Sequence, residues 1–272
     1  MSPTAPTPVA CSRMYNLNPR IRALWGSLFA WLAQESGIGL EVIAHTAPAP
    51  LSELWGRSDM GAVFMCGYPF SMLAPEERPV PLAAPVSTAP WAKGKPVYAS
   101  RIVTASNSGI EVGDLPTARW GWTVRDSQSG YHAPRAFLSR LPRGKLAGEP
   151  VGPLLNPAGV VAAIEAGKID VGAIDAYAYQ LLEMHEPETT ARLRIIATTE
   201  PTPFPLLVAS REQSPETIAT LARTLLGAHQ SDAGQAVLGP LGLTAFAEPD
   251  ISAYESLPQR ARAVDAALGV SW

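Results

Sequence analysis

The sequence predicts an α/β protein built of two similar halves. Short β-rich runs alternate with segments of helical periodicity, a pattern typical of α/β proteins rather than of sandwiches or helix bundles. The same order of elements begins again after Asp114. Two extended segments, 97–104 and 202–207, cross between the halves. We therefore expect two lobes with a ligand cleft between them, bordered by residues that directly follow strands.

The first half begins with a strand at 9–14 and a helix that ends near Gly37. The apolar residues of this helix recur at spacings of three and four, which places them on one face. They are Ile21, Leu24, Trp25, Leu28, Phe29 and Leu32. Strands at 41–45 and 61–66, with a short helix at 51–56 between them, complete a doubly wound unit.

The second half repeats this pattern and then leads back to the first. Asn156 and Pro157 are a helix cap and a first-turn proline, and they open a helix that closes at Gly167. The proline-rich segment 200–205 is interpreted as a hinge. The other elements expected are strands at 120–124, 171–174, 193–197 and 206–210, helices at 131–140 and 180–185, and a helical remainder at 215–268 with breaks at 239–240 and near Pro249.

These elements predict a discontinuous first lobe, residues 1–100 and 205–272, and a second lobe, residues 101–204. The chain has 272 residues, of which 47% are apolar and 17% charged, so either one large domain or two lobes can bury a full core. The formal net charge of -3 argues against nucleic acid as a partner, because a polyanion requires a basic surface.

Membrane insertion and export are not expected from the residues themselves. No apolar run approaches the roughly 18 residues that a spanning helix needs. A secretory signal has a basic region followed by a hydrophobic region, and residues 1–10 contain neither. A cytoplasmic location is therefore expected from the sequence as written. Cys11 and Cys66 are too few for a zinc site of their own, and two buried thiols are favoured.

Catalytic motifs and cofactor motifs are missing from the sequence. The phosphate-binding loop, the dinucleotide-binding glycine pattern, the zinc-protease helix motif and the nucleophile elbow are all absent, so no cofactor and no metal are predicted. His132 follows Ser129 by three residues, but no carboxylate at suitable spacing completes a catalytic relay. A surface or cavity-lining histidine is favoured there.

The most informative segment is the turn 126–131, which lies between a predicted strand and a predicted helix. The first turn of a helix has unpaired N–H groups and partial positive charge, so it can bind an anion without lysine. Its candidate ligand-binding residues are Ser127, Gln128, Ser129, Gly130 and Tyr131. The alternative is that a serine only caps the helix, and the segment alone does not decide between the two.

Two further candidates follow strands. Tyr68 comes directly after the strand 61–66, where a first-lobe residue would face the cleft; the alternative is an ordinary half-buried aromatic residue. Asp175 ends the strand 171–174 and could accept a hydrogen bond from an amine, a hydroxyl or a protonated oxyanion of the ligand. Its alternative role is to cap the next helix.

Together these segments resemble the phosphate/phosphite/phosphonate-type substrate-binding proteins of ABC importers. The resemblance spans about residues 9–230, with its motifs in the family's order. They are Cys66-Gly67-Tyr68, the crossing 96–103, the turn 126–131 with Pro134, the segment 167–175 and the proline-rich return.

The resemblance implies a type II periplasmic-binding fold that closes on a small oxyanion. By position, the family's ligand-binding residues correspond to Tyr68, Tyr98, Ser127, Gln128, Ser129 and Asp175. Two positions depart from the family: Gln128 replaces a threonine, and Asn156 with Pro157 stands where phosphonate binders place a histidine. Asn156 is also counted among the candidate ligand-binding residues. We therefore expect a small anionic or zwitterionic solute, phosphonate-like or phosphate-like. The resemblance also implies a permease partner and a periplasmic location.

Two other functions remain open at this point. An enzyme can occupy the same fold, as in menaquinone-pathway enzymes that resemble these binding proteins. A thiamine-pyrimidine synthase is disfavoured, because its family carries a cysteine-rich motif and this chain offers only Cys66 in that vicinity. The third function is that of a solute sensor or a degenerate paralogue with an empty cleft.

Overall fold

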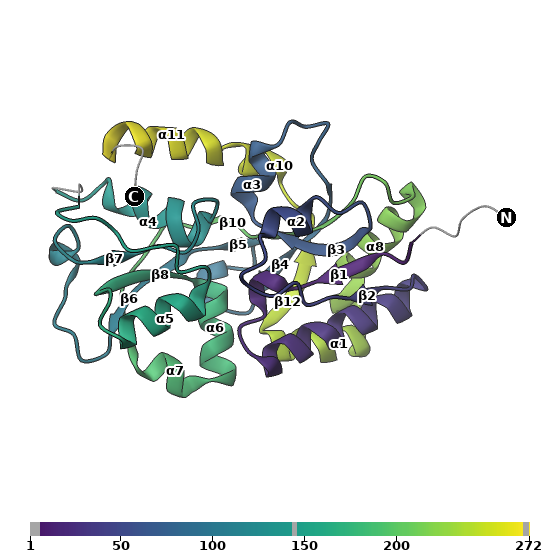
Figure 1. Ribbon diagram of the computed structural model, residues 1–272. Helices are drawn as coiled ribbons and strands as arrows, with labels where there is room; N and C mark the ends of the chain where they lie inside the picture. The colour runs from purple at the N-terminus through teal and green to yellow at the C-terminus, as the bar shows by residue number, and fades with distance from the viewer. Residues whose placement is uncertain (1–5, 143–145, 269–271) are drawn as a thin grey trace. The chain divides into compact units, whose positions relative to one another are not determined.

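The computed structural model describes residues 6–142, 146–268 and 272. Residues 1–5 lie outside the described residues, and they include half of the segment 1–10 that was considered for a secretory signal. Contacts divide the chain into two compact units (Figure 1). Unit 1 comprises Met1–Cys66, Leu73–Pro96 and Phe204–Asp250; unit 2 comprises Gly67–Met72, Val97–Pro203 and Ile251–Trp272. Residues 251–272 were expected in the first lobe, but by their contacts they group with unit 2. The division into two lobes at the expected boundaries stays a prediction.

Unit 1 contains a mixed six-stranded sheet in the order β12-β4-β11-β3-β1-β2. The pairings of β1 with β2 and β3, at one end of this order, are parallel, whereas β11 and β12 pair antiparallel with their neighbours. The strands are β1 (Val9–Cys11), β2 (Glu41–Val42), β3 (Met60–Met65), β4 (Val80–Ser87), β11 (Leu206–Ala209) and β12 (Leu243–Ala247).

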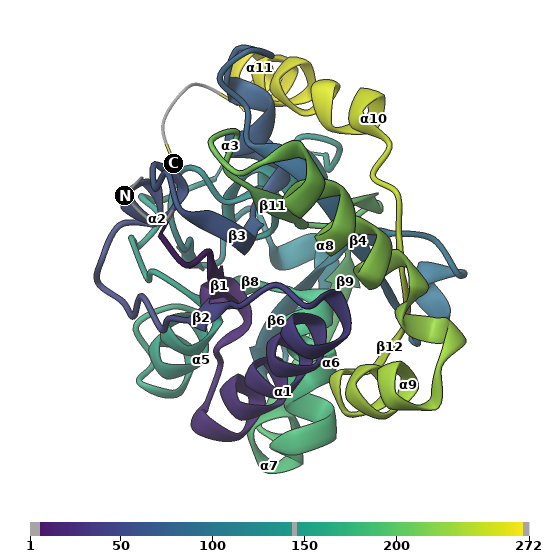
Figure 2. The ribbon, with the colours of Figure 1, turned by 90° about the vertical axis from the view of Figure 1, so that its right-hand side faces the viewer.

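The helices of unit 1 cover this sheet with apolar faces. Helix α1 packs on α8 and α9, and α8 packs on β4 and β12 (Figure 2). The predicted apolar face of α1 is confirmed, except that Leu24 is only half-buried. The helical elements are α1 (Pro19–Ser36), α2 (Leu51–Trp55), α8 (Pro215–Gly227) and α9 (Asp232–Leu238), with short turns η1 (Arg13–Tyr15), η2 (Pro90–Ala92), η5 (Ala228–Gln230) and η6 (Gly239–Leu241).

Two strands of unit 1 were not expected from the sequence. Strand β4 contains Pro81 and Pro85, and proline is rare inside a sheet because it has no N–H to donate. Strand β12 corrects the expectation that residues 215–268 are helical apart from breaks at 239–240 and near Pro249. Its five residues pair with β4 rather than continuing a helix, and so short a run carries little periodicity of its own.

Unit 2 contains a four-stranded sheet in the order β7-β8-β6-β9 and a separate antiparallel pair, β5 with β10. The expected single strand at 97–104 is therefore two strands in two different sheets. The strands are β5 (Val97–Tyr98), β6 (Ser100–Ala105), β7 (Trp120–Gly121), β8 (Val171–Asp175), β9 (Leu193–Thr198) and β10 (Thr202–Pro203). The two crossing segments of the sequence thus pair directly, with Tyr98 opposite Thr202.

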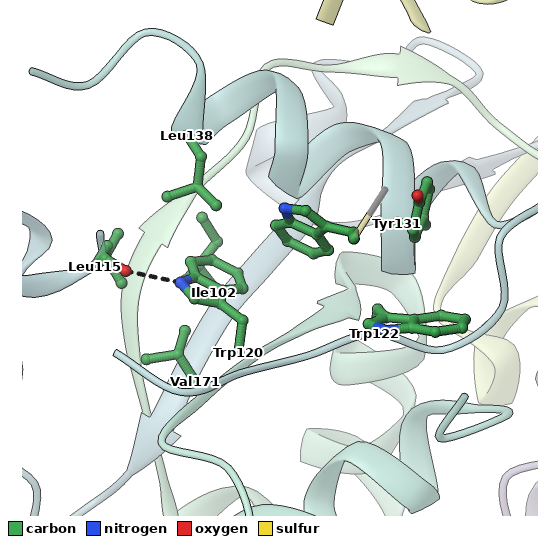
Figure 3. Close-up of a cluster of buried hydrophobic side chains, with 8 residues drawn as sticks. Ile102, Leu115, Trp120, Trp122, Tyr131, Leu138 and Val171 are labelled. Atoms are coloured by element: carbon green, nitrogen blue, oxygen red, sulfur yellow. Dashed lines mark hydrogen bonds between the residues drawn. The ribbon is translucent and has the colours of Figure 1, made fainter. Parts of the chain in front are cut away.

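The helices of unit 2 pack on this sheet around an aromatic core. The rings of Trp122 and Trp272 both meet the Tyr131 ring edge to face, and Trp272 also contacts Trp120. The Trp120 indole donates to the Leu115 carbonyl at 2.8 Å (Figure 3). The helical elements are α3 (Gly67–Met72), η3 (Val112–Asp114), η4 (Gln128–His132), α4 (Ala133–Leu138), α5 (Pro157–Glu165), α6 (Ala176–His185), α7 (Pro187–Ala191), α10 (Ile251–Glu255) and α11 (Leu257–Leu268).

Strand β7 is shorter than the expected 120–124. After Gly121 the main chain pairs with a loop instead of with a strand: the Trp122 amide donates to the Val151 carbonyl at 3.0 Å, and the Leu155 amide donates to the Thr123 carbonyl at 3.1 Å. The helix that follows begins at Gln128, earlier than expected, with a π-type turn.

Candidate functional site

One edge of the unit 2 sheet gathers most of the predicted ligand-binding residues. Strands β7 and β8 are parallel, so both end at this edge. Strand β6 is antiparallel to β8 and therefore begins there, with Ser100 opposite Asp175. The η4 turn, which follows β7, packs against β8. Thus the turn predicted to bind an anion lies next to the strand that ends in Asp175.

Ser127 positions the first turn of η4. Its hydroxyl oxygen accepts a hydrogen bond from the Gly130 amide at 2.9 Å, and its carbonyl accepts from the His132 amide at 3.1 Å. The capping role weighed for Ser127 is confirmed. Gln128 is buried and Ser129 is half-buried at this helix start, where the helix dipole is positive.

Gly130 is packed against Thr123. A Cβ atom at Gly130 would lie 2.1 Å from Thr123 Oγ1, so no other residue fits without displacement. The Thr123 Oγ1 atom is buried and has no hydrogen-bond partner among the described residues. Sequence reasoning missed Thr123, because it fell inside the predicted strand 120–124, whereas the observed strand ends at Gly121.

Asp175 caps helix α6. Its Oδ1 atom accepts from the Tyr177 amide at 2.8 Å and from the Ala178 amide at 3.1 Å, which confirms the capping role weighed for it. Its strand partner Ser100, which sequence reasoning missed, is fully buried, and the Ser100 Oγ atom has no partner in the described part of the chain. This edge therefore holds a second buried hydroxyl without a partner.

Tyr68 lies against the same helix start. Its ring stacks on the His132 imidazole, with ring centroids 3.7 Å apart and an interplanar angle of 30°. Burial raises the pKa of Tyr68, and the nearby carboxylate of Asp265 adds to this. Burial also lowers the pKa of His132 to about 4, assisted by Arg135 and opposed by Asp265 and the Arg125 carbonyl. His132 is thus a buried, uncharged histidine at neutral pH.

The remaining predicted residues have clear structural roles. Tyr98 is buried in β5. The side chain of Asn156 caps α5 by accepting from the Gly159 amide at 2.9 Å, as the sequence predicts. The ring of Tyr131 is part of the aromatic core (Figure 3), and its hydroxyl accepts from Arg125 at 3.1 Å. The Tyr131 side chain therefore has a structural role in the core.

Metal and thiol chemistry find no support in the described residues. No group of histidine, cysteine and carboxylate side chains there could hold a metal ion. Cys11 and Cys66 are both free and buried, as favoured from the sequence. None of the described helices combines the length and the hydropathy needed to cross a bilayer.

Comparison with solved structures defines the class as the two-lobed fold of solute-binding proteins. A binding-protein component of an ABC phosphonate transporter from Pseudomonas aeruginosa has a TM-score of 0.76 at 18% identity, covering 96% of this chain and 89% of that one. PhnD1 from Prochlorococcus marinus, in complex with methylphosphonate, has a TM-score of 0.74 at 14% identity, covering 94% and 97%. A Xanthomonas citri protein bound to ATP has a TM-score of 0.62 at 19% identity, covering 96% and 97%.

The chain belongs to a particular family within this class. Residues 15–254 match the family described as ABC transporter, phosphonate, periplasmic substrate-binding protein. The resemblance and the type II periplasmic-binding fold predicted from the sequence are confirmed. No curated protein sequence matches the chain significantly.

Proposed function

We propose that the chain binds a small anionic or zwitterionic solute with a phosphonate-like or phosphate-like oxyanion at the unit 2 sheet edge. The observation that carries the proposal is the pair of buried hydroxyls, Ser100 Oγ and Thr123 Oγ1, that have no partner among the described residues. Leaving such a group unsatisfied costs about 1–3 kcal/mol. An oxyanion can accept from both hydroxyls, and charge-assisted hydrogen bonds of this kind are stronger than neutral ones.

The first turn of η4 adds a favourable field for an anion. Ser127 satisfies the Gly130 amide, while Gln128 and Ser129 stand at the positive end of a helix that continues through α4 to Leu138. A dianion also meets the carboxylate of Asp175, which is only 7% exposed. A zwitterion with an ammonium group turned toward Asp175 would relieve that repulsion.

The biological role proposed is that of the binding component of an importer, with a permease as partner and the periplasm as location. This role is supported by the family match over residues 15–254. A different role as a solute sensor would use the same ligand contacts.

Replacing Ser129 by leucine tests the site. Ser129→Leu places a bulky apolar group at the first turn of η4, so we expect it to abolish methylphosphonate binding in titration calorimetry. Stability is expected to change little, because Ser129 is only half-buried. The matched control is Ser27→Leu on the exposed face of α1, which should retain binding. Parent-like affinity in Ser129→Leu would remove this residue from the site.

The enzyme alternative is separated from binding by the fate of the ligand. The protein is incubated with methylphosphonate and the mixture is analysed by mass spectrometry. Recovery of unchanged methylphosphonate supports the binding role, whereas a converted product would replace it by catalysis.

A further inference from the structure

A cavity in unit 2 lies between helix α4 and helix α11. It has a volume of about 270 Å³, and the segment 199–202 forms part of its wall. The η4–α4 helix contributes Gln128, His132 and Ala136, which follow one another at intervals of four residues and so share one helical face. Tyr131 and Leu138, on another face of this helix, belong to the aromatic core (Figure 3). The cavity is therefore distinct from the core.

Two residues of the cavity lining, Thr202 and His132, are buried, at 4% and 9% exposed. Thr202 Oγ1 has no hydrogen-bond partner among the described residues. The ring nitrogens of His132 make no hydrogen bond of good geometry there, although the Arg125 carbonyl lies close enough to raise the pKa of the ring. A neutral imidazole offers one donor and one acceptor, and a hydroxyl offers both. The ligand group that matches these side chains is one that both donates and accepts hydrogen bonds.

Three charged side chains line the cavity: Arg140, Glu200 and Arg260. Arg260 is exposed, and it is not among the charges that shift the pKa of His132. Arg140 and Glu200, which also line the cavity, form an exposed ion pair with each other. Arg135, which lies near His132, is paired with Asp265 at 2.5 Å. An anion beside His132 and Thr202 would lose its hydration without gaining an unpaired counter-charge there, which is unfavourable.

The remaining wall is apolar. Leu257, Ala261 and Val264 recur at spacings of four and three along α11, and Phe137 lines the cavity from α4. A cavity of about 150 Å³ with an apolar wall accommodates benzene. The larger volume here is sufficient for a benzene ring that carries one small polar group.

We propose that this cavity binds a small uncharged organic molecule, with a primary amide or an alcohol on a short apolar body. The polar group exchanges hydrogen bonds with His132 and Thr202, and the apolar body packs against α11. This site differs in chemistry from the oxyanion site, although Gln128 borders both. It stands on its own cavity and does not depend on the proposed oxyanion binding.

Benzamide is the probe, with benzoate as its charged analogue of the same shape. Calorimetry and ligand-observed NMR should detect benzamide binding to the full chain, with benzoate binding more weakly. Both titrations are repeated with methylphosphonate present. Because the two sites are separate, benzamide binding should be detected whether or not methylphosphonate binds. Two results would overturn the proposal. One is the absence of benzamide binding at about 10 mM, which corresponds to a binding free energy weaker than about 3 kcal/mol. The other is tighter binding of benzoate than of benzamide.

Two isosteric variants locate the site. Thr202→Val and His132→Phe remove the polar atoms but keep the side-chain shape, so each should weaken benzamide binding about fivefold to tenfold. Thr202→Val should also raise the melting temperature of the unliganded protein, because it removes a buried hydroxyl without a partner.

The matched control is Thr190→Val. Thr190 is 8% exposed, but its hydroxyl donates to the Pro187 carbonyl at 3.0 Å. This variant should lower the melting temperature and leave benzamide affinity unchanged. Benzamide binding that is insensitive to both Thr202→Val and His132→Phe contradicts the proposed site.

Discussion

Ser100 and Thr123 each bury a hydroxyl oxygen that finds no partner in the described part of the chain, at the same edge of the unit 2 sheet. Such groups lower the stability of the unliganded protein and gain hydrogen bonds when a ligand arrives. At the residue scale, binding and stability are therefore expected to change in opposite directions on substitution.

Ser100→Ala tests this expectation directly. We expect an increase in the free energy of unfolding of about 1 kcal/mol and a loss of methylphosphonate affinity, because the hydroxyl serves only the ligand. Chemical denaturation and calorimetry measure the two quantities. In the control Ser210→Ala, the lost hydroxyl accepts from the Glu212 amide at 3.2 Å, so stability should fall instead. A destabilised Ser100→Ala protein with full affinity would contradict the proposed role.

His132 predicts a specific pH dependence of stability. Its pKa is about 4 in the folded protein, against an ordinary value of 6.5, because burial disfavours the charged ring. Below pH 6.5 the unfolded chain binds a proton that the folded chain does not bind until about pH 4. The free energy of unfolding should therefore fall by about 3 kcal/mol as the pH drops through this window, and stay level above it.

His132→Phe should remove this part of the pH dependence while retaining the ring that stacks on Tyr68. Denaturation at several pH values between 4 and 8 gives the slope. An unchanged slope in the variant would mean that His132 is not the group responsible.

At the element scale, the start of helix α5 was predicted correctly, whereas α6 begins at Ala176 and not at the expected residue 180. Asn156 followed by Pro157 identified the start of α5, because an amide side chain and a proline both suit the first turn. The η4 start was less predictable. Its position depends on the contact between Gly130 and Thr123 and on the π-type turn, neither of which has a local sequence signal.

Gly130→Ala tests that contact. The added Cβ would lie 2.1 Å from Thr123 Oγ1, so the first turn of η4 must shift. We expect a loss of about 1–3 kcal/mol of stability, as for overpacked sites, together with weaker methylphosphonate binding. Gly148→Ala is the matched control, because a Cβ there meets nothing within 4 Å. Equal stability of the two variants would show that the contact is not constraining.

At the scale of the whole molecule, ligand binding should stabilise the folded chain by mass action. A ligand at 100 times its dissociation constant adds about 2.7 kcal/mol to the free energy of unfolding. Differential scanning calorimetry with methylphosphonate, phosphate, sulfonates and small carboxylates should show the largest increase in melting temperature for the oxyanion that is bound. Preference for a carboxylate over every phosphonate and phosphate would contradict the proposed ligand class.

The sequence by itself determined the alternation of strands and helices, the apolar face of α1, the caps at Asn156 and the family. Each of these depends on side-chain periodicity or on short motifs, which are readable without knowing the neighbours in space. Only the tertiary structure decided that β4 and β12 are strands, that Tyr68 stacks on His132, and that Ser100 and Thr123 bury unpartnered hydroxyls. These features join residues far apart in the chain, so packing and hydrogen-bond partners, rather than local preference, determine them.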